Sequence, residues 1–124
     1  MKKIHTDLAP AAVGPYSQAM KTGNLLYISG QGGIDPATGK VVEGGVEAET
    51  LQAIKNIAAI LEEGGTDFSK VVKTTCFLAN ISDFAAFNAI YAEYFTSKPA
   101  RSTVAVKELP LNFQVEIEVI AEVD

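Results

Sequence analysis

The fold is decided by the stretch Val71-Val72-Lys73-Thr74-Thr75-Cys76-Phe77-Leu78, which is rich in β-branched residues and predicts a strand. Side chains alternate between the two faces of a strand, and both alternating sets of this stretch contain apolar residues. Such a pattern is typical of a strand that is covered on both sides. Two predicted helices can cover only one face of the sheet. The second face needs another cover, and a further copy of the same chain is the simplest one.

The two helices are predicted on either side of this strand. The first begins near Val46, carries apolar residues at helical spacing and ends at Gly64-Gly65. Its spaced residues are Leu51, Ile54, Ile57, Ala58 and Leu61. The second is expected to begin at Ser82, whose hydroxyl suits an N-cap, and to end before Pro99. Its broad apolar face consists of Phe84, Phe87, Ile90, Tyr91, Tyr94 and Phe95.

Four further strands are predicted at residues 16–20, 24–29, 101–106 and 113–122. Residues before Gly14-Pro15 are expected to form an irregular lead, and a turn at 35–40 precedes a short strand at Val41-Val42. The chain therefore reads as a single α+β domain over residues 1–124, with one mixed sheet and two helices on one face. Sequence order alone favours a hairpin between the last two strands.

The composition limits the partners and the compartment. The chain of 124 residues is 48% hydrophobic and has a net charge of −5, which predicts a packed core and argues against nucleic acid and membranes as partners. Its one cysteine, Cys76, cannot form an internal disulfide, and no Cys/His spacing suits a metal site. Neither a signal peptide nor a membrane span is expected, so the predicted location is cytoplasmic.

Two charged residues on predicted strands are candidates for chemistry. Arg101 shares a strand face with Thr103, and it is either a surface salt-bridge residue or a fork that binds a carboxylate through two hydrogen bonds. Glu116 lies on the polar side of the last strand. Its structural interpretation is an amphipathic strand whose polar side faces water. Ile120 falls on the same side, however, and a partly covered carboxylate can orient a water molecule or exchange a proton.

Three other residues have both a structural and a functional interpretation. Asn88 lies beside the apolar stripe of the second helix, where a half-buried amide needs hydrogen-bond partners, most often backbone groups. Tyr16 follows Gly14-Pro15, and it either packs in the core or is aimed at a ligand by the stiff turn. Cys76 is interpreted as a small buried hydrophobe rather than as a nucleophile.

Several separated motifs agree with one known pattern. They are Ala9 to Ala19 (APAAVGPYSQA), Ile28 to Gln31 (ISGQ), Val71 to Thr75 (VVKTT), Asp83 to Asn88 (DFAAFN), Pro99 to Pro110 (PARSTVAVKELP) and Val115 to Glu118 (VEIE). In this order they closely resemble the signature of the RidA/YjgF family of reactive intermediate deaminases. The resemblance spans nearly the whole chain.

The resemblance implies a chorismate-mutase-like α+β fold that assembles as a homotrimer with clefts between the subunits. In this fold the final strand lies between the first hairpin and Val71 to Leu78 instead of forming a hairpin with its predecessor. The implied activity is the hydrolysis of 2-imino and enamine acids, such as 2-aminoacrylate, to 2-keto acids and ammonia without a cofactor.

The resemblance also assigns roles to residues of this sequence. It implies that Arg101 holds the substrate carboxylate and that Glu116 positions the attacking water. The other implied cleft positions, all substrate-binding, are Tyr16, Ser29, Gly30, Asn88 and the backbone at Thr103.

Two departures from the family pattern bear on the cleft. Thr103 stands where many members have cysteine, which excludes thiol chemistry at this position. Gly32-Gly33 replaces an apolar residue and proline, and it is expected to loosen a loop of the cleft. Two other functions stay open: a non-catalytic regulatory protein that binds small carboxylates, and an RNA-cleaving translation inhibitor, against which the acidic charge argues.

Overall fold

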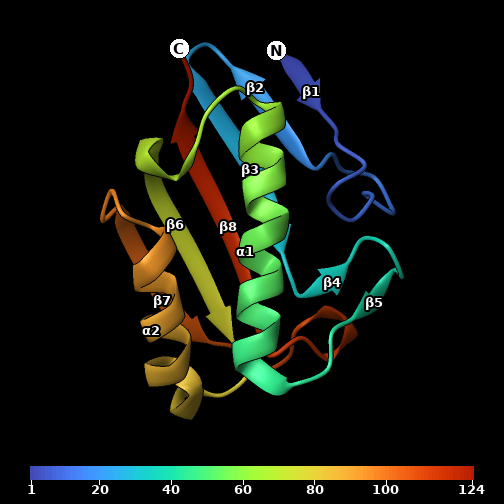
Figure 1. The fold of residues 1–124 in the computed structure, drawn as a ribbon, viewed down its shortest axis with the longest axis vertical. Helices are drawn as coiled ribbons and strands as arrows, with labels where there is room; N and C mark the ends of the chain where they lie inside the picture. Colours follow the sequence, from blue (N-terminus) through green and yellow to red (C-terminus); the bar gives the residue numbers. More distant parts are fainter.

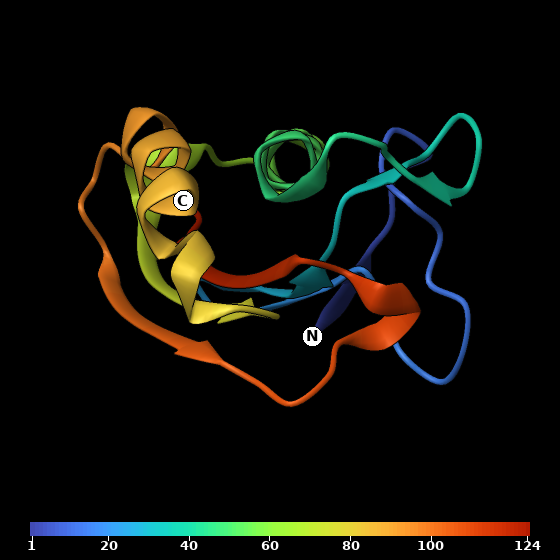
Figure 2. The same cartoon turned by 90° about the horizontal axis from the view of Figure 1, so that it is seen from below.

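Two helices cover one face of a six-stranded sheet in the computed structural model, which describes residues 1–124 (Figure 1). Helix α1 spans Gly45–Glu63 and helix α2 spans Phe84–Tyr94, and both lie on the same side of the sheet (Figure 2). The predicted α+β architecture is confirmed. Most of the predicted stripe of α1 faces the core, but Leu51 is exposed, and Thr50 and Ala53 are buried in its place.

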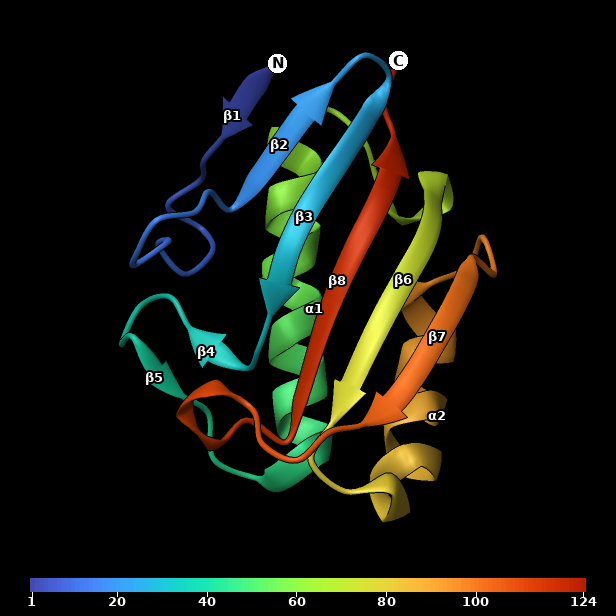
Figure 3. The same cartoon turned by 180° about the vertical axis from the view of Figure 1, so that it is seen from behind.

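The sheet has the strand order β1-β2-β3-β8-β6-β7. These strands span Lys2–Ile4, Ala19–Thr22, Leu25–Gln31, Val115–Glu122, Val71–Leu78 and Ala100–Ala105, respectively. β6 and β7 are parallel, whereas the other neighbours are antiparallel. The last two strands therefore form no hairpin, and β8 lies at the centre, as the resemblance implied. A separate pair, β4 (Ile34–Asp35) and β5 (Lys40–Val41), flanks the sheet (Figure 3).

The early boundaries differ from the prediction. β1 lies in the segment that was expected to be irregular, and β2 begins at Ala19 rather than at Tyr16. β3 continues to Gln31 because its pairing with β8 resumes there, opposite Ile117, after a register shift that follows Ile28. Such a bulge leaves no alternation signal in the sequence.

β6 has the predicted bounds, but its first residues do not alternate as expected. A register shift between Val71 and Lys73 places Val71 in the core and leaves Val72 exposed. Thr74, Cys76 and Leu78 are fully buried beneath the helices. The opposite face of the sheet has no helix over it, and we call it the open face (Figure 3).

The start of α2 also differs from the prediction. Ser82 does not cap the helix, because the short 3₁₀ turn η2 (Ile81–Asp83) precedes α2 and no side chain makes a cap hydrogen bond. Two similar turns, η1 (Phe68–Lys70) and η3 (Pro110–Asn112), precede β6 and β8. No helix is long and apolar enough to cross a membrane.

Candidate functional site

The predicted site residues fall into two groups that lie on different parts of the sheet. The arginine half-site comprises Asn88, Arg101 and Thr103, on α2 and β7. The glutamate half-site comprises Tyr16, Ser29, Gly30 and Glu116, on the open face and the loop beside it. The strand β6 separates β7 from β8, so one chain does not bring the two groups together.

Arg101 is held between aromatic rings and an amide. It pairs in register with Thr74 of β6, whose hydroxyl is hydrogen-bonded to the Tyr91 hydroxyl at 2.7 Å. The guanidinium carbon lies 4.7 Å from the centroid of the Tyr91 ring and 5.5 Å from that of Phe84. Its Nη1 donates to Asn88 Oδ1 at 2.7 Å. Asn88 thus bonds to a side chain rather than to the backbone.

No carboxylate of the chain pairs with Arg101. The two ion pairs present are His5–Asp7 and Lys70–Asp124, so the interpretation of Arg101 as a surface salt-bridge residue is wrong. Only one of its N–H donors has a protein acceptor. The remaining donors of the fork are free to bind an anion.

A depression of about 400 Å³ surrounds this guanidinium. It is lined by Asn88, Tyr91, Ala92, Phe95, Lys98, Pro99 and Arg101. Two cations and no acidic residue line it, although the whole chain carries a net charge of −5. The arginine half-site is therefore a locally cationic depression within an acidic protein, and such a depression suits an anion.

Thr103 lies two residues further along β7 (Ala100–Ala105) than Arg101. It pairs in register with Cys76, and its hydroxyl is buried without a hydrogen-bond partner. Burial raises the pKa of the Cys76 thiol to about 11, so this cysteine stays protonated at neutral pH. The interpretation of Cys76 as a packing residue is confirmed. β7 is an edge strand, so one side of its backbone is free for the contact expected at Thr103.

Glu116 lies on the open face without a hydrogen-bond or ion-pair partner in the chain. Desolvation, and secondarily the charge of Glu118, raise the pKa of the Glu116 carboxyl. The side chain is half-buried, so this part of the strand is not a fully solvated face. A carboxyl with a raised pKa and no partner suits proton transfer.

The lack of a side chain at Gly30 leaves room for the Glu116 carboxylate. A Cβ atom added at Gly30 would overlap the Glu116 carboxylate, so the absence of a side chain lets this carboxylate lie against the backbone of β3. Glu116 shares a depression of about 650 Å³ with Tyr16, Ser29 and Gly30. The structure thus brings together the four predicted residues of the glutamate half-site.

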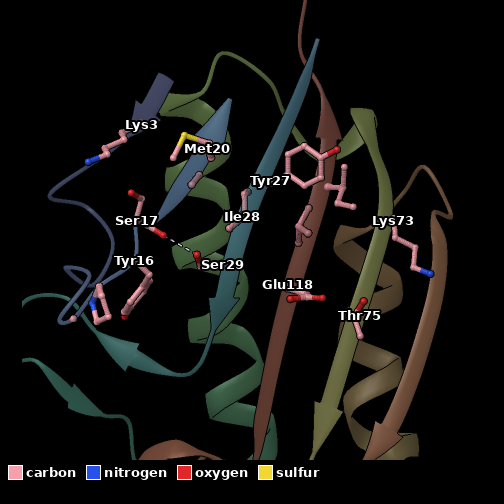
Figure 4. Close-up of a pocket in the computed structure, with 15 residues that line it drawn as sticks. Lys3, Tyr16, Ser17, Met20, Tyr27, Ile28, Ser29, Lys73, Thr75 and Glu118 are labelled. Carbon is pink, nitrogen blue, oxygen red and sulfur yellow. Dashed lines mark hydrogen bonds between the residues drawn. The ribbon is translucent and has the colours of Figure 1, made fainter. Parts of the chain in front are cut away.

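Tyr16 lies on an exposed loop, so the interpretation as a core aromatic is wrong. Ser29 Oγ donates to the backbone oxygen of Ser17 at 2.7 Å and ties this loop to β3 (Figure 4). The neighbouring Gln18 is buried and acts as a bracket, because its amide oxygen accepts from Thr6 N at 2.7 Å and its nitrogen donates to Pro10 O at 2.8 Å. The bracket formed by Gln18 was not predicted, because its partners Thr6 and Pro10 lie eight or more residues away in the chain.

Gly32-Gly33 does not form a loose loop. A Cβ atom on Gly33 would lie 2.7 Å from Glu49 Cα, and one on Gly32 would lie 2.5 Å from the Phe113 ring. The buried Asn56 donates to Gly32 O at 3.2 Å and to Ile34 O at 2.9 Å. Gly33 therefore permits close packing against α1 and Gly32 against Phe113, and the expectation of a looser loop is wrong.

Glu49 is another buried acid that the sequence analysis did not identify. Its Oε1 accepts from Gln114 N at 2.8 Å and so joins α1 to the start of β8. Desolvation raises the pKa of the Glu49 carboxyl, and the Gln114 hydrogen bond opposes this effect. No cluster of three or more His, Cys, Asp or Glu residues is placed to hold a metal ion.

Comparisons with known proteins find similar chains over nearly the whole length of this one. The model of the family described as Endoribonuclease L-PSP matches residues 6–123. A Lactococcus lactis protein named as a candidate regulator, AldR, is 54% identical over 124 residues, which are 99% of this chain and 98% of that protein. The 2-iminobutanoate/2-iminopropanoate deaminase of Mus musculus is 52% identical over 121 residues, which are 97% of this chain and 90% of the mouse protein.

Solved structures give the same result. The crystal structure of RidA from the Antarctic bacterium Psychrobacter superimposes with a TM-score of 0.95 at 45% identity and covers 99% of this chain and 100% of its own. The family model and the similarity to both deaminase and RidA proteins cover nearly the whole sequence. The chain therefore belongs to the RidA/YjgF family, whose family model bears the description Endoribonuclease L-PSP.

Proposed function

We propose that this protein is a cytoplasmic deaminase that hydrolyses 2-imino and enamine acids, such as 2-aminoacrylate, to 2-keto acids and ammonia without a cofactor. The name of the mouse relative supports this reaction class. The observation that carries the proposal is the pair of complementary groups: an arginine with free donors at Arg101, and a partly desolvated acid at Glu116.

The separation of these groups supports a site between subunits. Arg101 lies toward the helix side of the sheet, whereas Glu116 lies on the open face. A copy of the chain that packs against the open face of its neighbour would place the arginine half-site of one beside the glutamate half-site of the other. A ring of three copies then contains three equivalent clefts.

The chemistry follows from this arrangement. The free N–H groups of Arg101 hold the substrate carboxylate, which fixes the position of the imine carbon C2. Glu116 takes a proton from a water molecule as the water oxygen bonds to C2, and it passes this proton to the nitrogen as the C=N double bond becomes a single bond. In the resulting amino alcohol Glu116 takes the hydroxyl proton and passes it to the nitrogen as the C–N bond breaks, so that ammonia leaves, the 2-keto acid forms and Glu116 is a carboxylate again. An enamine enters the same path after protonation at C3.

The experiment generates an imino acid in situ from alanine with an amino-acid oxidase and follows release of the 2-keto acid. Addition of the protein should accelerate the loss of the imine. If the rate equals that of the uncatalysed reaction while the 2-keto acid still binds, the chain is the carboxylate-binding regulator instead. RNA cleavage that persists in Arg101→Ala would favour the ribonuclease alternative.

Sedimentation tests the proposed trimer separately from the reaction. Sedimentation in dilute buffer should give a trimer at micromolar concentration, because the open face of an isolated chain leaves Tyr27 and part of Ile120 uncovered. A well-folded monomer at this concentration would contradict both the trimer and the cleft between subunits.

A further inference from the structure

The depression that contains Glu116 has apolar lining residues for which the proposed hydrolysis gives no role. Its volume is about 650 Å³, within the range of sites that bind whole small molecules. Tyr16, Ser29 and Glu116 are among its polar lining residues. The apolar lining consists of Pro10, Val13, Ile34, Pro110, Leu111 and Phe113.

Two of these apolar side chains are unusually exposed. Val13 is 84% exposed and Leu111 is 67% exposed, and they come from segments nearly a hundred residues apart in the chain. Both nevertheless line the same depression as the acid. Large aliphatic side chains that gather at a concave surface indicate a site for an apolar group.

The backbone holds Leu111 in an unfavourable conformation. Its φ and ψ are 55° and 22°, in the left-handed region that a leucine rarely adopts and that costs on the order of 1 kcal/mol. The segment is anchored next to it: Gln114 N is bonded to Glu49, and Phe113 packs against Gly32. A strained residue that its surroundings hold in place is typical of a functional site.

We infer that this apolar lining binds the side chain of the substrate, so that the protein prefers 2-imino acids with large aliphatic side chains over the alanine-derived imine. The inference rests on the proposed function. When Arg101 of a neighbouring copy holds the carboxylate and C2 lies beside Glu116, the third substituent of C2 extends along the depression. Leu111 and Val13 are then specificity-determining residues.

The charges of the lining residues also favour a substrate with an aliphatic side chain. Glu116 and Glu118 line the depression, and no lysine or arginine does. An imino acid with an acidic side chain would meet repulsion from these two carboxyl groups, because this depression supplies no cation of its own. An aliphatic side chain meets only the apolar lining and gains by leaving water.

The experiment compares imines generated in situ from alanine and from leucine, as kcat/KM, in trimers verified by sedimentation. The wild type should favour the leucine-derived imine by about tenfold, as expected when a few carbon atoms enter an apolar pocket. Leu111→Ala should lose most of this preference. Ile81→Ala, which truncates a similarly exposed side chain (62%) outside the depression, should keep the preference.

Val13→Ala is the second variant, because Val13 lines the same depression but belongs to a different segment of the chain from the strained Leu111. It should also reduce the preference, and this result decides the matter if Leu111→Ala fails to assemble. Equal turnover of both imines by the wild type, or a preference that survives in Val13→Ala and in an assembled Leu111→Ala, would overturn the inference and leave the deaminase proposal intact. Absence of turnover with either imine would reject the proposed function itself.

Discussion

The arginine half-site and the glutamate half-site differ in how the chain holds their charged groups. Arg101 lies over the Tyr91 ring and donates to Asn88, so its position is fixed by contacts within one chain. Glu116 has no such partner, and it lies against the bare backbone at Gly30 with a raised pKa. A group that anchors a substrate needs fixed geometry, whereas a group that exchanges protons needs a free carboxyl whose pKa is close to the working pH.

The largest expected effect comes from Arg101, which is the only arginine in the chain. Arg101→Ala should lose nearly all deaminase activity. Arg101→Lys keeps the charge but not the two parallel donors, and it should lose about tenfold or more, since each ~1.4 kcal/mol is a factor of ten. Steady-state kinetics on intact trimers measures this, with Lys70→Ala as the control. Full activity in Arg101→Ala would remove the arginine half-site from the mechanism.

Replacement of Glu116 should separate anchoring from proton transfer. Glu116→Gln should bind a 2-keto acid as tightly as the wild type but turn over roughly a hundredfold more slowly, a typical loss for a missing general base. Wild-type turnover should fall as the pH is lowered through the raised pKa of Glu116, because the base becomes protonated. Calorimetry and a pH–rate profile test both statements. A variant that loses binding together with turnover would show that Glu116 acts as an anchor.

Substitutions at two glycines should separate an effect on catalysis from an effect on stability. Gly30→Ala should push the Glu116 carboxylate aside and reduce kcat several-fold with little change in stability, because only the end of a flexible side chain moves. Gly33→Ala should instead cost about 2 kcal/mol of unfolding free energy, since its Cβ would meet the backbone of Glu49 at 2.7 Å. Denaturant unfolding and kinetics on both variants would show the contrast. A large stability loss in Gly30→Ala would contradict it.

The smallest effect is expected at Cys76, which lies in the core below the arginine half-site. Cys76→Ala should lower the free energy of unfolding by about 1 kcal/mol, as modest core truncations do, and leave activity within about twofold. The protonated thiol has no part in the proposed reaction. Inactivation of a folded Cys76→Ala trimer would show that this residue has a chemical role.

The sequence was sufficient for those parts of the fold that periodicity determines. The bounds of β6, the end of α1 at Gly64 and the α+β class follow from local patterns. The shift at Val72 and the start of β2 at Ala19 do not, because bulges and loop brackets depend on partners distant in the chain.

For the candidate site the sequence predicted which residues take part, but not how the chain holds them. Motif resemblance selected Arg101 and Glu116, but the contact of Arg101 with Asn88 and the fit of Glu116 over Gly30 depend on the packing of separate elements. Spacing alone also could not show that the two half-sites lie apart within one chain, since this follows from the position of β6 between β7 and β8.

In the proposed mechanism each cleft takes Arg101 from one copy and Glu116 from another. Arg101→Ala and Glu116→Gln are each expected to be nearly inactive alone. When equal amounts are unfolded and refolded together, clefts that pair the intact arginine of one variant with the intact glutamate of the other should form. In randomly mixed rings about one quarter of the clefts are then complete, and about a quarter of wild-type activity should return. Mixed trimers that stay as inactive as the separate variants would contradict the account.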